Sequence, residues 1–400
     1  MTMPLTELLG HEFDLSQTLP PEVLVEPIGF FRKARAPKGR TMAKPGLLER
    51  LAAGPVICAE GYLFELERRG YLQAGAYVPE VVLDFPEQVE NLHRDFLRAG
   101  SDVIEAFTYY AHREKLRLIG RESDLEPMNR AALAMAKKVA AEGDALVAGN
   151  ICNTNVFTAG DAAIAKQVRA MFEEQVGWAA EAGVDFIVAE TISWLGEADI
   201  ALAVMRQTKL PTVVTFALHK DGLMRDGFTP DEAAKRLADK GADVVGLNCA
   251  RGPRTMMPFV RKIRDAVAVH VAALPVPYRT TKEEPTFQSL TEKDADCAHC
   301  IPDGRSFPVA LDPFQVTRYE IAEFGREALT ANIRYLGVCC GAGPHHIRAL
   351  AESSGSPAAG QSLLCRHVQA LRVRNRREPQ ARKSRIRQEP LNQARLASSR

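Results

Sequence analysis

Short runs of β-branched and other apolar residues alternate along the chain with longer amphipathic segments rich in Ala, Glu, Lys and Arg. The runs have the length of buried strands, and most of the segments between them have helical periodicity. Repetition of this pair predicts βα units arranged around a parallel sheet. Eight strands are predicted, at residues 55–59, 101–107, 145–151, 184–190, 211–217, 242–249, 269–275 and 333–340.

Eight strands in about 300 residues fit a (β/α)8 barrel better than an open doubly wound sheet. The segment after the first predicted strand, AEGYLFELERRG, contains neither a G-x-G-x-x-G nor a P-loop pattern, so a nucleotide-binding sheet loses its main support. We therefore predict an α/β fold, a (β/α)8 TIM barrel, over residues 42–353. The active site of such a barrel forms where the C-terminal ends of the strands meet.

Composition is that of a soluble globular protein, with 46% hydrophobic and 25% charged residues. The apolar runs are too short for a membrane span, and the N-terminal stretch lacks the basic start and apolar core of a signal peptide. These observations predict a cytoplasmic protein. Eight cysteines in 400 residues are too few for a disulfide scaffold, which leaves them as buried thiols, nucleophiles or metal ligands.

The two ends of the chain differ from its body. Residues 1–41 are rich in proline and are predicted to be a disordered extension. Residues 354–400 form a predicted disordered basic tail, in which positions 361–400 carry eleven Lys and Arg against two Glu. A nucleic-acid or membrane contact is the alternative role for such a tail, but we predict neither partner.

Cysteines and one glutamate end three of the predicted strands: Glu190, Cys249, and the adjacent pair Cys339 and Cys340. Packing alone explains a single buried cysteine, but the three cysteines lie together at one mouth of the predicted barrel. Three thiolates suit a catalytic zinc site, which keeps three protein ligands and leaves the fourth position open. Where the last strand bends into the sequence GAGP, both Cys339 and Cys340 can face one ion.

The open position suggests the chemistry of the substrate. A metal-bound thiol loses its proton, so a sulfur-rich site is suited to activate an incoming thiol at neutral pH. A disulfide between Cys339 and Cys340 is the competing chemistry. It leaves Cys249 unexplained and forms a strained ring.

Several of these stretches resemble a known family. VDFIVAET, VVGLNC and RYLGVCCGAGPHHIRAL are similar to the homocysteine S-methyltransferase family, and GYLFELERRGYLQAGAYVPE with LHRDFLRAGSDVIEAFTYYAHREKL resembles its betaine–homocysteine S-methyltransferase branch. The likeness covers about residues 45–353. It implies a zinc-dependent barrel that transfers a methyl group to L-homocysteine to make methionine. It also implies that Cys249, Cys339 and Cys340 hold Zn²⁺ and that Glu190 holds the homocysteine amino group.

The betaine branch further implies betaine as the methyl donor and dimethylglycine as the second product. Onium methyl groups offer no hydrogen-bond handle, so aromatic faces are expected to recognise them. Tyr77 and Tyr110 stand where the branch has aromatic donor-binding residues. Tyr77 replaces a tryptophan and Thr191 an aromatic residue, which leaves a sulfonium donor such as S-methylmethionine or dimethylsulfoniopropionate as an alternative. The DGG motif of the branch is AEG at 59–61, so Glu60 becomes a candidate for the homocysteine site.

Other interpretations also stay open from the sequence. The rival of another class is a non-catalytic, zinc-stabilised barrel or binding protein. The C-x-x-C at Cys297 and Cys300 is weak evidence for a second metal site, and a mobile loop over the barrel mouth is the preferred interpretation. The barrel is expected to be a monomer or a homodimer associated through its helices.

Overall fold

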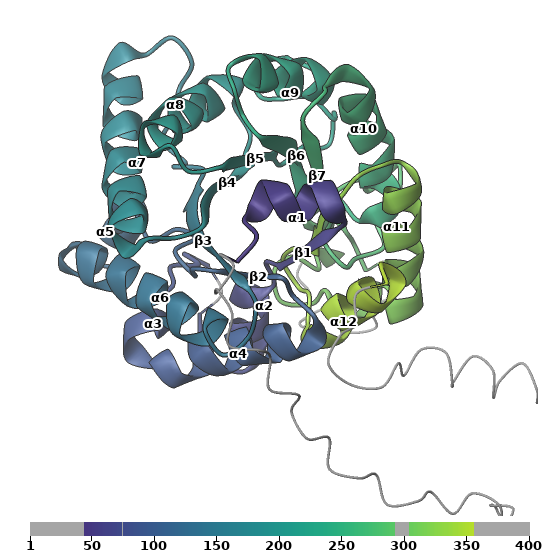
Figure 1. Cartoon of the computed structure of the whole chain (residues 1–400), viewed down its shortest axis with the longest axis horizontal. Helices are drawn as coiled ribbons and strands as arrows, with labels where there is room; N and C mark the ends of the chain where they lie inside the picture. Colours follow the sequence, from purple (N-terminus) through teal and green to yellow (C-terminus); the bar gives the residue numbers. More distant parts are fainter. Residues whose placement is uncertain (1–43, 74, 293–303, 356–400) are drawn as a thin grey trace, which may run out of the picture. The chain divides into compact units, whose positions relative to one another are not determined.

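The structure, a computed structural model, describes residues 44–73, 75–292 and 304–355 (Figure 1). The predicted extension at 1–41 lies outside these ranges, as does the C-x-x-C at 297–300. Of the predicted tail, only residues 354 and 355 are described. The domain bounds at 42 and 353 therefore stay predictions.

Eight parallel strands close into a ring, which confirms the predicted (β/α)8 barrel. Each strand pairs with the next one in sequence, and β8 pairs with β1 in the register Val56 to Tyr335. All eight strands fall inside the predicted runs or overlap them closely. They are β1 (Val56–Ala59), β2 (Val103–Glu105), β3 (Leu146–Cys152), β4 (Phe186–Ile192), β5 (Thr212–Phe216), β6 (Val244–Asn248), β7 (His270–Leu274) and β8 (Tyr335–Val338).

Helices surround the ring, as Figure 1 shows. The described helices are α1 (Leu47–Ala53), α2 (Tyr62–Arg68), α3 (Val81–Asp84), α4 (Pro86–Ala99), α5 (Arg113–Leu118), α6 (Leu125–Ala140), α7 (Ala162–Ala182), α8 (Leu195–Met205), α9 (Pro230–Asp239), α10 (Pro253–Ala266), α11 (Arg318–Thr330) and α12 (Pro344–Ser353). Local sequence sets several of their starts. Thr229 and Thr317, for example, begin α9 and α11 as capping boxes, because each accepts a hydrogen bond from the backbone N–H of a glutamate three residues later.

Alternate residues along each strand separate two cores. Side chains such as Val56, Cys58 and Phe186 point into the ring and pack together, whereas Ile57 and Ile187 point outward against the helices. Helix α1 contributes Leu47 and Leu51 to the inner core. It therefore closes the end of the barrel where the strands begin, and Figure 1 shows it lying across the ring.

Three aspartates repeat one contact at that closed end. Asp102, Asp185 and Asp243 immediately precede β2, β4 and β6, and each carboxylate accepts a hydrogen bond from the first or second backbone N–H of the preceding strand. The distances are 2.8, 2.7 and 2.9 Å. The pair β8 and β1 has a different connection, because Arg334 donates to the carbonyls of Leu51 and Ala52 at the end of α1. These contacts hold the starts of the strands in place. They all lie at the end of the barrel opposite to the C-terminal ends of the strands.

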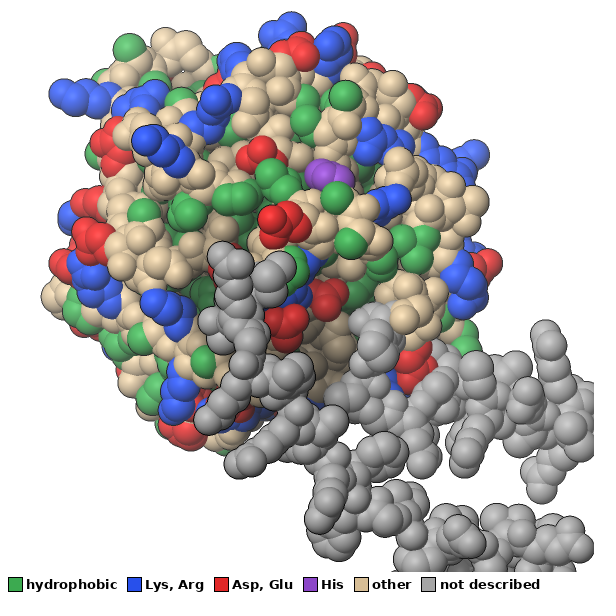
Figure 2. All heavy atoms as spheres, viewed as in Figure 1, with side chains coloured by type: hydrophobic (Ala, Val, Ile, Leu, Met, Phe, Trp, Pro, Cys, Tyr) green, Lys and Arg blue, Asp and Glu red, His purple; other side chains and the backbone are tan. Residues whose placement is uncertain are grey.

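The surface of the barrel is mixed in charge. On the face drawn in Figure 2, Lys and Arg side chains are interspersed with Asp and Glu over the described residues that are visible. No helix in the described ranges has the length and apolar character needed to cross a membrane.

Candidate active site

Three cysteine sulfurs converge at the open end of the barrel. Cys249 follows the last residue of β6, and Cys339 and Cys340 follow the last residue of β8. The sulfur atoms of all three lie within 4.8 Å of one another, and those of Cys339 and Cys340 are 3.9 Å apart. Tetrahedral coordination at about 2.3 Å places sulfur ligands about 3.8 Å apart, so the three cysteines fit one metal ion. At 3.9 Å the adjacent pair is not joined by a disulfide.

The backbone explains why sulfurs from two strands meet. The N–H of Cys249 donates to the carbonyl of Leu274, and the N–H of Cys339 donates to the neighbouring carbonyl of Pro275. The end of β7, which lies between β6 and β8, thus holds both cysteine segments. The sequence pattern predicts Cys249 as the last residue of a strand at 242–249, whereas β6 ends at Asn248. Cys249 lies just beyond, with a left-handed backbone (φ 56°) that turns it out of the strand path.

The three thiols differ in pKa. Hydrogen bonds with Cys339 and Cys340 lower the pKa of Cys249 well below that of an ordinary thiol. Burial raises the pKa of Cys339, and the bond to Cys249 raises that of Cys340. The cluster therefore favours a thiolate at Cys249, which is the protonation state that a metal ion requires.

Beside the sulfurs, three buried glutamates line a small cavity of about 20 Å³. Glu60, Glu105 and Glu190 come from the ends of β1, β2 and β4, and Cys339 and Cys340 are among the other residues that line the cavity. Burial is the main cause that raises the pKa of all three carboxyl groups, to about 7 for Glu105 and well above the usual range for Glu60 and Glu190. A cavity of this size accommodates one water-sized group. With three carboxyls around it, an ammonium group suits it best.

Two asparagines bridge these carboxyl groups. Asn150 on β3 donates to Glu105 at 2.5 Å and to Glu190 at 2.7 Å, and Asn248 on β6 donates to Glu190 at 2.7 Å and to Glu60 at 3.4 Å. One oxygen of Glu60 is buried and has no partner within the described part of the chain. An unpaired buried carboxylate oxygen is costly, so a cationic ligand at this position is favoured.

Sequence reasoning named Glu60 and Glu190 but missed Glu105, Asn150 and Asn248. The signal was present in the alternation of the strands. Val103 faces the interior of the barrel, and so does Glu105 two residues later; Leu146 and Ala148 are followed in the same way by Asn150. The polar network is therefore the outermost layer of the barrel interior.

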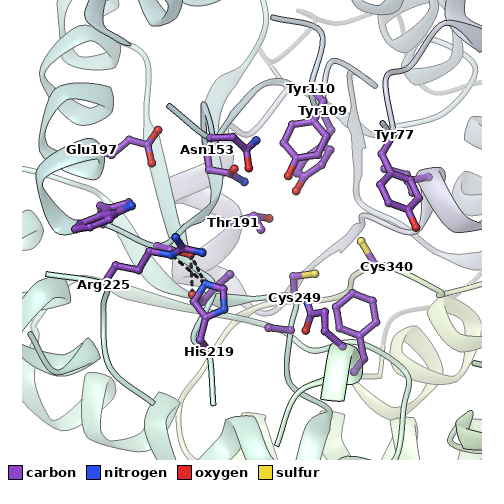
Figure 3. A pocket seen from close by; sticks show the side chains of 18 of the residues that line it. Tyr77, Tyr109, Tyr110, Asn153, Thr191, Glu197, His219, Arg225, Cys249 and Cys340 are labelled. Atoms are coloured by element: carbon purple, nitrogen blue, oxygen red, sulfur yellow. Dashed lines mark hydrogen bonds between the residues drawn. The ribbon is translucent and has the colours of Figure 1, made fainter. Parts of the chain in front are cut away.

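A larger pocket of about 260 Å³ opens on the other side of Cys249 and Cys340. Tyr77 and Tyr110, both predicted for the donor site, line it together with Tyr109 (Figure 3). Further aromatic rings come from Phe64, Phe157, Trp194, Phe287 and Phe307. The ring of Tyr110 has the Lys115 ammonium 3.9 Å from its centre, and the ring centres of Tyr109 and Tyr110 are 4.2 Å apart, so both of these rings are partly covered.

Backbone strain is concentrated around this pocket. Of the eight non-glycine residues with positive φ in the described ranges, six line it: Tyr77, Tyr110, Asn155, Thr191, Cys249 and Ala250. Such conformations cost of order 1–3 kcal/mol each and persist where the surrounding structure holds a functional arrangement. The strain therefore marks this pocket as the functional end of the barrel.

Comparison with known proteins gives one consistent family. The family model described as "Homocysteine S-methyltransferase" matches residues 59–354. Betaine–homocysteine S-methyltransferase 1 of Danio rerio is 40% identical over 314 residues, which cover 78% of this chain and 76% of that protein. The S-methylmethionine–homocysteine S-methyltransferase of Pongo abelii is 37% identical over 325 residues, covering 79% and 83%.

A solved structure with the same fold is that of the homocysteine methyltransferase MmuM from Escherichia coli in its metallated form. It is similar with a TM-score of 0.59 at 18% sequence identity, over 76% of this chain and 98% of that one. At that identity the similarity concerns the fold alone.

Proposed function

The chain belongs to the homocysteine S-methyltransferase family, and from this premise we propose that it transfers a methyl group from betaine to the thiol of L-homocysteine, forming methionine and dimethylglycine. The observation that carries the proposal is the position of Cys249, Cys339 and Cys340. Their sulfurs lie between the acidic cavity and the aromatic pocket. A thiol substrate and a cationic donor can thus approach the same point from two sides.

Cys249, Cys339 and Cys340 would hold Zn²⁺, whose fourth position is then open to the substrate. When bound, the ion supplies the positive charge that keeps the homocysteine thiol deprotonated near neutral pH. Glu190 and Glu60 would bind the ammonium group of homocysteine. Because Asn248 donates to both carboxylates and is followed directly by Cys249, it aligns the amino-group site with the sulfur site.

The aromatic pocket would hold the donor. Faces of Tyr77 and Tyr110, together with the neighbouring Tyr109, would attract a quaternary ammonium group without a hydrogen bond to its methyls. In the transfer, the homocysteine sulfur forms a bond to one methyl carbon while the carbon–nitrogen bond breaks and its electron pair stays on nitrogen. The positive and negative charges of the reactants disappear together, so alignment and exclusion of water are the main demands on the protein.

A sulfonium donor is the second candidate. It is favoured by Thr191 and Tyr77, which depart from the betaine branch, and by the comparable identity of this chain to a relative named for S-methylmethionine. The carbon–sulfur bond of that donor would break in the same in-line manner.

One assay tests the proposal. The purified full-length protein is loaded with zinc, its metal content is measured by mass spectrometry, and methionine formation from homocysteine is followed with betaine, dimethylsulfoniopropionate and S-methylmethionine. Turnover fastest with betaine is expected. Zinc binding without turnover of any donor would instead support a non-catalytic, zinc-stabilised barrel. The predicted cytoplasmic location and monomeric or homodimeric state are separate questions that this assay leaves untouched.

A further inference from the structure

The pocket beside the cysteines has a basic corner that the reaction described above does not use. His219 and Arg225 lie on the loop between β5 and α9, and both line the pocket. Figure 3 shows them together on one side, with Tyr77, Tyr109 and Tyr110 on the other and Thr191 between. One pocket thus combines an aromatic end with a cationic end.

The loop places Arg225 firmly although its side chain is exposed. The backbone N–H of Arg225 donates to the carbonyl of Ser193 at 2.8 Å. The next residue, Asp226, accepts hydrogen bonds from the backbone N–H groups of Leu195 and Gly196 at 3.2 and 3.1 Å, at the start of α8. Because two successive residues are tied to a neighbouring segment, the guanidinium is presented from a fixed backbone.

Arg225 forms no ion pair in the described part of the chain, although its charge lowers the pKa of Glu197, which also lines the pocket. Among the residues that the structure describes, no acidic oxygen lies within ion-pair distance of it, and its Nε contacts Nε2 of His219 at 3.4 Å. The nearby carboxylate of Glu197 is buried and accepts from the backbone N–H and hydroxyl of Thr154. Asp226 is occupied at the start of α8.

A second arginine strengthens the positive field. Arg251 is buried behind the loop and donates to the backbone carbonyls of His219 and Lys220. Burial lowers the pKa of His219, and the charges of Arg225 and Arg251 lower it further, while the charge of Asp221 opposes them. Nε2 of His219 accepts from Nε of Arg225 and so helps to orient the guanidinium. A guanidinium held in this way is suited to bind a carboxylate through its terminal N–H groups.

We propose that the guanidinium of Arg225 binds a carboxylate of the methyl donor, so that the pocket selects zwitterionic donors that carry an onium group and a carboxylate. This inference rests on the proposed function. It assigns the onium end of the donor to the tyrosines beside the cysteines and the anionic end to the basic corner. A cation without a carboxylate, such as a simple trialkylsulfonium, would lack the second contact.

The carboxylate of homocysteine is the other anion in the reaction, but it fits the corner poorly. Its ammonium and carboxylate groups are on the same carbon atom. If Glu60 and Glu190 hold the ammonium in the acidic cavity, the carboxylate stays on that side of the cysteines. The kinetic constants for homocysteine distinguish the two sources.

The test compares Arg225→Gln with Lys220→Gln, a variant that removes the same charge from the same loop at a residue that does not line the pocket. Each full-length, zinc-loaded protein is assayed with dimethylsulfonioacetate and with its methyl ester, which keeps the reactive methyls but lacks the anionic group. Arg225→Gln should raise the KM for the carboxylate donor about 10- to 100-fold, with a smaller change in kcat. The KM for the ester and for homocysteine should stay within about twofold of wild type, and Lys220→Gln should leave all three values unchanged.

Binding without turnover provides a second measurement. Trp194 lines the pocket, and Trp178 is the only other tryptophan in the sequence. In a Trp178→Phe background, quenching by betaine should therefore report on the pocket, and Arg225→Gln should weaken it about 10- to 100-fold.

The outcomes separate the two proposals. Equal effects of Arg225→Gln on the acid and the ester, a larger effect on the KM of homocysteine, or unchanged betaine binding would each overturn the inference. A wild-type protein that binds betaine in an Arg225-dependent way but makes no methionine would instead overturn the proposed function and leave the carboxylate site standing.

Discussion

Asn248 donates a 2.7 Å hydrogen bond to Glu190, although the two residues stand on strands β6 and β4 with β5 between them. The same amide group is 3.8 Å from the sulfur of Cys339, and Cys249 is the next residue in the chain. Its side-chain oxygen accepts from the backbone N–H of Thr191 and from the hydroxyl of Thr215. Asn248 therefore links the acidic cavity to the cysteine cluster. Hydrogen bonds to both its oxygen and its nitrogen fix the orientation of its amide group.

Replacement of any one of the three clustered cysteines should remove the metal and the activity together. Cys249→Ala, Cys339→Ala and Cys340→Ala each leave two sulfurs, too few for the three-ligand site. Zinc content by mass spectrometry and methionine formation are measured on the same preparations. Cys152→Ala is the matched control for zinc content, because Cys152 is buried but belongs to no cluster among the described residues that fits a metal ion. Stoichiometric zinc in all three variants would refute the assignment.

Glu190→Gln should weaken homocysteine binding by about 2–4 kcal/mol, because the substrate ammonium loses its charged partner in a buried site. Zinc content should be unchanged, since Glu190 is not one of the three sulfur ligands. Isothermal titration of homocysteine into the zinc-loaded variant measures the effect. An affinity equal to that of the wild type would reject this role for Glu190.

Glu105 should make the barrel less stable as pH rises. Its folded pKa of about 7 lies above the unfolded value of about 4.3, so the folded state holds an extra proton between these limits. Stability then falls as pH increases from about 4.3 to about 7. Glu105→Gln removes this dependence, and its advantage over wild type should grow to at most about 4 kcal/mol by pH 8. Urea unfolding at pH 5, 6, 7 and 8 with constant zinc checks this. If the free energy of unfolding changed with pH in the same way for both proteins, the assignment of this dependence to Glu105 would be wrong.

Removal of residues 356–400 should leave zinc content, thermal midpoint and quaternary state essentially unchanged. The described barrel is closed by β8 pairing with β1, and α12 ends at Ser353, before the deleted segment. The tail is also rich in arginine and has little apolar periodicity. Size-exclusion chromatography with light scattering compares the two forms. A full-length tetramer that dissociates on truncation would show that the tail carries an assembly signal.

The alternation of short apolar runs and amphipathic segments was enough to predict the barrel, because the strands are buried along nearly their whole length. The convergence of the cysteines followed from the same pattern, since strand ends meet at one mouth. Predicted strand ends were less accurate. Residues 101–107 form only the three-residue β2, because Ser101 instead bonds through its hydroxyl to Ile57 and Val103, and the chain turns after Glu105.

Two parts of the site could not be found from spacing alone. The pairing of Asn150 with Glu105 and Glu190 depends on the register of β3 between β2 and β4, which single runs do not specify. Arg225 lies in a loop whose path is set by contacts with Ser193 and α8, far away in the sequence. In both cases the contact depends on how segments that are separated in the sequence lie next to each other in the fold.

The two kinds of chemical group at the mouth come from opposite ends of the chain. The carboxylates lie on β2 and β4 and directly after β1, whereas the thiols follow β6 and β8. A nascent chain that ends before residue 339 contains at most one of the three thiols of the cluster. Such a chain lacks the complete three-cysteine cluster, whatever part of the barrel it has folded. Uptake of the ion at this cluster would therefore be a late event in biogenesis, after the last strand has joined the first.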